Sequence, residues 1–350
     1  MEVDLAVTWR DCSYLHDLIE QPDALARTIA ALADEQALDR LAGALLSGRW
    51  RRVVLTGMGS SYWACRPLYL RLLKEGLTPM MIETGELIHY ERDWLSADTL
   101  VVAVSQSGRS VEIVRLLECA RGRSEIIGVT NTPDSPLAVD STATLLMQAG
   151  SECTVSCKTY LATLLALEWL GDLLCGSDRA PLLSQARAAV DPMREYLLQW
   201  PAHVHQLRPL MEGVGHIFVT GRGPSVAAAE TGGLILKEST HYPAEGLSAA
   251  AFRHGPFELL SDRVFVLVLE GDARSAELSR KLVADVQEAG GRSALVSPAA
   301  QGVFRTPECA ERIRPLMEIL PVEMLTLALA AAQGREPGRF ERASKVTVVE

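Results

Sequence analysis

The sequence has no C-x-x-C pair, few aromatic residues and no excess of basic residues. Its seven cysteines are scattered, and the nearest pair, Cys153 and Cys157, has no histidine close by. Such a set is typical of reduced thiols, so we expect no metal site and no cofactor. The formal net charge of −10 disfavours nucleic acid as a partner. A small phosphate ligand remains compatible with this charge, because local dipoles govern such a contact.

Long apolar runs and a secretory start are also missing. The longest apolar stretch, 161–170, contains Glu168, and no run reaches the length of a membrane span. The start, Met-Glu-Val-Asp, lacks the basic residues and apolar centre of a signal peptide. We therefore expect a cytoplasmic protein without a membrane segment. Hydrophobic residues make up 48% of the 350, which is ample for two buried cores.

One stretch combines a buried strand with a polar loop. Residues 101–104 are apolar and mostly β-branched, and Ser105-Gln106-Ser107-Gly108-Arg109-Ser110 follows directly. A helix is predicted from Val111 onward. Backbone N–H groups at a helix start, with several hydroxyls beside them, favour an anion such as phosphate. The alternative is an ordinary strand-to-helix turn in which a serine caps the helix.

The chain alternates between predicted strands and helices. The strands are expected at 53–56, 80–83, 101–104, 126–130 and 145–147, and the helices at 13–47 with a break at Pro22, 62–75, 111–118 and 159–174. This alternation predicts an α/β fold with a doubly wound parallel sheet between two helical layers. The polar loops after Leu55, Val104 and Val129 then share the carboxyl edge of the sheet, where ligands bind in such folds.

The pattern repeats in the second half. Residues 216–225 resemble 53–61 at an offset that aligns Gly57 with Gly221, and the same offset aligns Ser105 with Leu269. The second copy has Leu269-Glu270-Gly271 where the first has serines, so we expect two sheets but one anion site. In the second copy, Pro243-Ala244-Glu245-Gly246 is predicted to interrupt a helix over 231–238. The predicted organisation is listed here: a helical segment 1–34, domains 35–178 and 200–335, and a C-terminal tail 336–350.

Three further residues have ordinary structural explanations when taken singly. Glu238 would be a solvated helix residue, His254 a turn residue before Gly-Pro, and Lys345 a surface cation in the tail.

Taken together, these motifs resemble proteins with tandem sugar-isomerase (SIS) domains, in particular the isomerase half of glucosamine-6-phosphate synthases. The resemblance covers nearly the whole chain. The motifs that carry it are, in order, 18–22, Gly59-Ser60-Ser61-Tyr62, Ser105-Gln106-Ser107-Gly108, 130–133, 152–160, Leu236-Lys237-Glu238, Arg253-His254-Gly255-Pro256 and Ser344-Lys345-Val346-Thr347. Each motif is weak, but their shared order is specific.

The resemblance implies a role for each matching residue. The residues implied to hold a sugar 6-phosphate are Ser60, Ser61, Ser105, Gln106, Ser107 and Ser110, and those implied to contact the sugar are Gly59, Val155 and Ser156. Glu238 would move a proton between C1 and C2 of the open-chain sugar. His254 would assist ring opening, reaching the site from the neighbouring subunit of a homodimer, and Lys345 would bring the tail over the sugar as a lid.

The sequence departs from the synthases at several points. It begins at Met1-Glu2 without a glutaminase domain, so glutamine-dependent amination is not expected. Ile235 and Ala251 stand where the synthases have a lysine and a glutamate, so the preferred substrate is expected to differ. Cys157 replaces a common threonine, and no role follows from it.

Four functions share at least part of this pattern. The leading one is a phosphosugar isomerase that interconverts an aldose, or amino-aldose, 6-phosphate and its ketose. A deaminase or deglycase would use the same base and the same phosphate site. A sugar-phosphate sensor would need the serines but not Glu238, His254 and Lys345. A dinucleotide-binding enzyme is excluded because neither glycine loop completes G-x-G-x-x-G.

Overall fold

The computed structural model describes residues 9–33, 35–36, 38–342 and 344–347. The chain forms two compact units built from alternating segments. The N-terminal unit comprises Asp23–Ser151, Lys158–Arg187 and Ala343–Glu350, and the C-terminal unit comprises Met1–Pro22, Glu152–Cys157 and Ala188–Arg342. The predicted domains 35–178 and 200–335 are continuous in sequence, whereas each of these units also contains short segments from distant parts of the chain.

The N-terminal unit is organised around a five-stranded parallel sheet in the order β2-β1-β3-β4-β5. The strands are β1 (Arg52–Thr56), β2 (Pro79–Met81), β3 (Thr99–Val104), β4 (Glu125–Thr130) and β5 (Ala143–Leu146). All six residues of β3 are buried, because this central strand has a helical layer on each face. The predicted parallel sheet is therefore confirmed.

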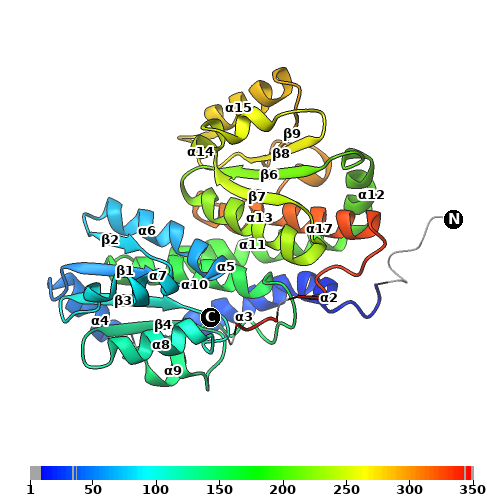
Figure 1. Ribbon diagram of the computed structural model, residues 1–350. Coiled ribbons are helices and arrows are strands. Elements are labelled where there is room, and N and C mark those ends of the chain that lie inside the picture. Colours follow the sequence, from blue (N-terminus) through cyan, green and yellow to red (C-terminus); the bar gives the residue numbers. More distant parts are fainter. Residues whose placement is uncertain (1–8, 34, 37, 343, 348–350) are drawn as a thin grey trace. The chain divides into compact units, whose positions relative to one another are not determined.

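Helices cover both faces of this sheet (Figure 1). They are α3 (Gln21–Ala33), α4 (Asp39–Leu46), α5 (Gly59–Trp63), α6 (Cys65–Lys74), α7 (Thr84–His89), η1 (Arg92–Trp94), α8 (Val111–Ala120), α9 (Pro136–Asp140) and α10 (Lys158–Leu174). One core cluster joins Leu87 of α7 and Ile113 of α8 to Val101 of β3. On α10, nearly every residue is buried, which explains its largely apolar sequence.

The C-terminal unit repeats the arrangement with four parallel strands in the order β7-β6-β8-β9. They are β6 (His216–Gly221), β7 (Ala244–Ser248), β8 (Val264–Leu269) and β9 (Arg292–Val296). The helix α13 (Val226–Thr240) ends before the predicted interruption at 243–246, but residues 244–246 begin β7, a strand that the sequence pattern did not predict. Two glycines explain why: a Cβ on Gly233 of α13 would lie 2.0 Å from the Gly246 nitrogen. The strand therefore depends on close backbone contact more than on side-chain propensity.

The helices of this unit also lie on both faces of its sheet, with α15 on one side and α13 on the other (Figure 1). They are α2 (Ser13–Ile19), α12 (Trp200–Leu210), η2 (Gly223–Ser225), α13 (Val226–Thr240), α14 (Ala249–Arg253), η3 (Pro256–Leu259), α15 (Ala276–Glu288), η4 (Gly302–Phe304), η5 (Glu311–Ile313), α16 (Arg314–Glu318) and α17 (Leu320–Ala332). The remaining helix, α11 (Ala180–Leu198), is divided between the two units.

Two helix boundaries differ from the prediction. The first break lies at Glu20, between α2 and α3, and Pro22 falls in the first turn of α3, where a missing N–H costs nothing. The helix expected at 62–75 begins earlier, at Gly59, and is divided at Ala64 into α5 and α6.

A longer apolar stretch than the one identified from sequence lies near the C-terminus. The helical run Glu311–Ala332 is long and apolar enough to cross a membrane by composition, but 89% of its 18-residue window is buried inside the protein. This burial is typical of a core helix. Glu318 and Glu323 interrupt the run, and both carboxylates are fully buried.

Candidate functional site

The polar loops after β1 and β3 start side by side. Thr56 pairs with Ala103 in the parallel register of these strands. A Cβ on Gly57 would lie 2.9 Å from the Val104 carbonyl oxygen, so only glycine allows the two loops to approach this closely. The loop after β1 carries Ser60 and Ser61, and the loop after β3 is residues 105–110, here called the serine loop. Both open at the carboxyl edge of the sheet.

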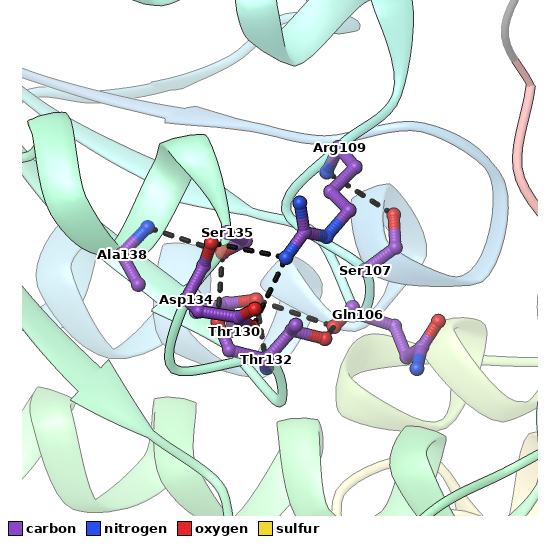
Figure 2. A network of polar contacts seen from close by, with 8 residues as sticks. All are labelled: Gln106, Ser107, Arg109, Thr130, Thr132, Asp134, Ser135 and Ala138. Carbon is purple, nitrogen blue, oxygen red and sulfur yellow. Dashed lines mark hydrogen bonds and ion pairs between the residues drawn. The ribbon is translucent and has the colours of Figure 1, made fainter.

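The loop after β4 stabilises the backbone of the serine loop through hydrogen bonds. The Gln106 carbonyl accepts hydrogen bonds from the Asn131 N–H at 3.1 Å, the Thr130 hydroxyl at 3.2 Å and the Thr132 hydroxyl at 3.4 Å. Figure 2 shows the Gln106 carboxamide pointing away from this network. The main chain of Gln106 is thereby fixed, whereas its side chain takes no part in this network.

Two serines of the loop stabilise its turn. The Gly108 N–H donates to the Ser105 hydroxyl at 3.1 Å, and the Arg109 N–H donates to the Ser107 hydroxyl at 3.2 Å. A hydroxyl that accepts one such bond can still donate its own proton to an anion. Arg109 forms an ion pair with Asp134 at 3.0 Å (Figure 2). This pair neutralises the cation within the serine loop, so hydroxyl and backbone dipoles dominate the loop.

Ser110 precedes α8 without capping it. Its backbone is extended and its side chain makes no cap hydrogen bond, so the structure does not support the alternative of a serine-capped turn. The first amide of α8 is used differently, because the Val111 N–H donates to the Thr347 carbonyl at 3.2 Å. The tail residues 344–347 therefore lie at the start of α8, and the half-buried Lys345 is two positions from this contact.

Gly108 is the strictest position in the loop. Its φ is +61°, and a Cβ would lie 2.2 Å from the Ser135 hydroxyl oxygen. We expect Gly108→Ala to lower the free energy of unfolding by about 1–3 kcal/mol and to weaken phosphate binding by distorting the loop. Urea unfolding and phosphate calorimetry measure the two effects. Gly122→Ala is the matched control, since Gly122 has φ +71° but open space around it. Equal losses in both variants would contradict a tightly packed Gly108.

The residues predicted after β1 lie at the start of a short helix. Gly59 begins α5 with φ +53°, and Ser60 and Ser61 follow in its first turn. Both serines are half-buried. The structure thus places Gly59, both serines, the serine loop and Lys345 in the N-terminal unit.

The remaining predicted residues belong to the C-terminal unit. Glu238 is half-buried in the last turn of α13. It lies within electrostatic range of the fully buried Tyr14 and contributes to the raised pKa of that phenol, which is caused mainly by burial. Glu238 therefore lies close to a fully buried part of the unit.

The fully buried Glu323 also lies within electrostatic range of Tyr14. Burial raises the pKa of Glu323 to about 8, the nearby charge of Glu152 adds to the shift, and a hydrogen bond from Gln21 opposes it. The Gln21 amide donates to Glu323 at 2.8 Å. Glu323 consequently keeps its proton at neutral pH, which limits the negative charge inside the unit.

Val155 and Ser156 lie in the short segment Glu152–Cys157, which belongs to the C-terminal unit. The Glu152 carboxylate accepts the Cys157 N–H at 2.9 Å and so closes this loop. Val155 is buried and Ser156 half-buried. Of the two, Ser156 has the more accessible side chain.

His254 lies immediately after α14. Its imidazole is exposed, and its backbone N–H donates to the Ala251 carbonyl at 2.9 Å. Gly255 follows with φ +126°, a value suited to glycine. The neighbouring Arg253 is held by Asp285 at 2.5 Å.

The sequence reasoning missed one titratable group on α13. Burial raises the pKa of Glu230 to about 7, while Lys237 opposes the shift. A half-buried carboxylate of this kind can exchange protons at neutral pH. No motif marks Glu230, since its sequence neighbours are alanine and threonine. Within the described residues, no three His, Cys, Asp or Glu side chains are grouped so that they could hold a metal ion.

A comparison with protein families identifies both halves of the chain. The model of the SIS domain matches residues 48–171 and 210–300. The chain belongs to the SIS domain family. The two matched regions contain the two parallel sheets, so the SIS fold is duplicated here, as the internal repeat predicts.

Curated relatives of this SIS protein are larger. The glutamine–fructose-6-phosphate aminotransferases (isomerizing) of Pyrobaculum aerophilum and Pyrococcus horikoshii are each 28% identical over 96% of this chain. These alignments span 57% of each relative. The chain therefore covers a little over half the length of the curated relatives that it matches.

Solved structures share the fold across nearly the whole SIS protein. The C-terminal domain of a glucosamine-fructose-6-phosphate aminotransferase from Francisella tularensis has a TM-score of 0.79 at 19% identity, covering 94% of this chain and 98% of that one. A glucosamine-6-phosphate deaminase from Thermotoga maritima has a TM-score of 0.78 at 18% identity, covering 96% and 100%. A tagatose-6-phosphate ketose/aldose isomerase from Escherichia coli has a TM-score of 0.68 at 18% identity, covering 94% and 96%.

Proposed function

We propose that this protein is a phosphosugar isomerase that interconverts an aldose, or amino-aldose, 6-phosphate and its ketose. The observation that carries the proposal is the serine loop in a chain of the SIS family. Its backbone is fixed by Thr130, Asn131 and Thr132, whereas the Gln106 and Ser110 side chains are left available. Such a rigid group of donors is preorganised for a phosphate.

In this proposal the phosphate lies against α8. The donors are the hydroxyls of Ser60, Ser61, Ser105, Ser107 and Ser110, the Gln106 side-chain amide and the first-turn amides of α8 that follow Val111, whose own N–H donates to Thr347. The Arg109–Asp134 ion pair keeps the loop near neutral, so binding rests on many weak donors rather than one cation. Lys345 supplies a positive charge from the tail, which contacts the start of α8.

Glu238 performs the proton transfer. Its carboxylate removes the proton from C2 of the open-chain aldose, and the electron pair of that bond forms the double bond of an enediol between C1 and C2. The proton on the C2 hydroxyl moves to the oxygen on C1. Return of the first proton to C1 then gives the ketose, and no atom is lost or gained. His254, whose imidazole is exposed, assists ring opening from a neighbouring subunit of a homodimer.

A deaminase or deglycase is the second candidate, because the same enediol chemistry can release an amine. Ile235 is fully buried on α13, and Ala251 lies in α14. Neither residue brings charge to the region of Glu238 and His254. The surroundings of the reacting carbons would therefore be less polar than in the aminotransferases.

The decisive experiment follows single sugars in D₂O. Glucose 6-phosphate, glucosamine 6-phosphate, tagatose 6-phosphate and a fructosamine 6-phosphate are incubated with the protein and followed by proton NMR, with ammonia and amine assayed in parallel. The proposal expects deuterium at C1 or C2 together with a ketose or aldose product. Release of ammonia or amine would assign the deaminase or deglycase function. Saturable binding of several sugars without deuterium exchange would replace the enzyme by a sugar-phosphate sensor.

A further inference from the structure

The C-terminal unit keeps the geometry of the serine loop although it lacks the serines. Thr56 pairs with Ala103 in the first sheet, and Thr220 pairs with Val268 in the second. Gly271 follows Val268 by three positions, just as Gln106 follows Ala103. The sequence-based alignment of Ser105 with Leu269 is therefore wrong by one residue, and Ser105 corresponds to Glu270.

The same register relates the loops after β1 and β6. Ser225 follows Thr220 by five positions, as Ser61 follows Thr56. A Cβ on Gly271 would lie 3.4 Å from the Ser225 hydroxyl oxygen. A serine hydroxyl and a loop amide thus lie close together in the second copy, at the positions of Ser61 and of the Gln106 main chain in the first.

A carboxylate occupies the point where these two donors meet. Glu318 of α16 is fully buried, and its Oε1 accepts the Gly271 N–H at 3.0 Å. Burial raises the pKa of the Glu318 carboxyl to about 7, and the nearby Ser225 hydroxyl opposes this rise by favouring the charged form. Its other oxygen, Oε2, makes no hydrogen bond within the described residues. A carboxyl group supplied by the protein itself therefore lies between the two loops of the second copy.

Charged side chains of both signs lie around Glu318. Arg314 donates to the Gly271 carbonyl and favours the ionised carboxyl, whereas Glu270 opposes it. Glu270 is itself paired with Arg280 at 2.9 Å, and Asp272 is paired with Arg274. Arg314 thus provides a positive charge near the carboxyl group, and a bound phosphate would also need such a charge.

We propose that the C-terminal unit contains a second phosphate-type anion site, matching the one in the N-terminal unit, and that the Glu318 carboxylate occupies it. Duplication of the SIS fold thus duplicated the anion site as well, and α16 closed the second copy. The expected ligand of the opened site is inorganic phosphate or another small oxyanion.

The test removes the internal anion and counts bound phosphate. Calorimetry with inorganic phosphate is run on the wild type and on Glu318→Ala, and the variant is expected to bind one more phosphate per chain. Adding Ser225→Ala to that variant should weaken the new binding by about tenfold or more. Glu323→Ala is the matched control, since it also removes a fully buried glutamate, and it should gain no site.

The outcomes separate this inference from the proposed function. If the wild type binds no phosphate and Glu318→Ala binds one, the second site exists although the first does not. Equal numbers in the two proteins overturn the inference, as does a gain in Glu323→Ala. If Glu318→Ala is insoluble, it is refolded from urea with and without 100 mM phosphate. Recovery only with phosphate supports the site, and recovery in neither buffer or equally in both overturns it.

Discussion

Glu238→Gln is expected to lower kcat for sugar-phosphate isomerisation by about 10²–10⁴-fold, the usual contribution of a general base. The amide keeps the size of the side chain but cannot accept a proton from carbon. The phosphate donors lie on other elements, so sugar-phosphate affinity is expected to change little. Deuterium incorporation at C1 and C2 measures the proton transfer directly, and calorimetry measures the affinity.

Two further variants make this result specific. Glu230→Gln tests the other proton-exchanging carboxylate of α13, whose pKa is about 7, and Glu288→Gln replaces an exposed glutamate on α15. A large loss of exchange in Glu230→Gln with normal exchange in Glu238→Gln would move the base to Glu230. Loss in Glu288→Gln would point to a general effect on the preparation.

Glu323→Gln is expected to remove much of the loss of stability that the wild type suffers as pH rises. The folded-state pKa of Glu323, about 8, is above the unfolded value of about 4.3. The folded chain therefore holds a proton that the unfolded chain has released. The resulting stabilisation is complete below about pH 4.3 and falls by roughly 1.4 kcal/mol per pH unit until about pH 8. Glutamine remains neutral throughout.

The measurement is urea unfolding of both proteins between pH 5 and pH 8. The two should differ little at pH 5, and the variant should be more stable by roughly 2–4 kcal/mol at pH 8. Glutamine can still accept the hydrogen bond from Gln21. The substitution therefore removes no hydrogen bond whose loss would offset the gain in stability at pH 8. Glu288→Gln controls for the removal of an exposed charge. Parallel pH profiles for wild type and Glu323→Gln would show that Glu323 is ionised in the folded protein.

The sequence predicted what depends on local pattern. Buried β-branched residues followed by serines located β3 and the serine loop, and the repeated Gly-x-Gly located β6. The strand β7 was missed because Ala244 and Gly246 have low strand propensity, and only the contact with Gly233 explains it.

Features that depend on tertiary burial could not be predicted in the same way. Charged residues are mostly exposed, so Glu318 and Glu323 gave no signal, although both lie in the core. The assignment of Glu152–Cys157 to the C-terminal unit also depends on contacts with residues far away in sequence, such as the hydrogen bond from the Cys153 N–H to Asp17. Spacing alone contains no information about such contacts.

The interleaving of the chain restricts how this gene can change by recombination. The N-terminal unit includes Ala343–Glu350, and the C-terminal unit includes Met1–Pro22 and Glu152–Cys157. A single crossover between the two repeats would leave each unit with segments from both parents. The contact between Thr347 and the start of α8, for example, would then join residues of different origin. We therefore expect exchange of one repeat alone to yield poorly folded hybrids, which favours inheritance of the whole chain as one piece.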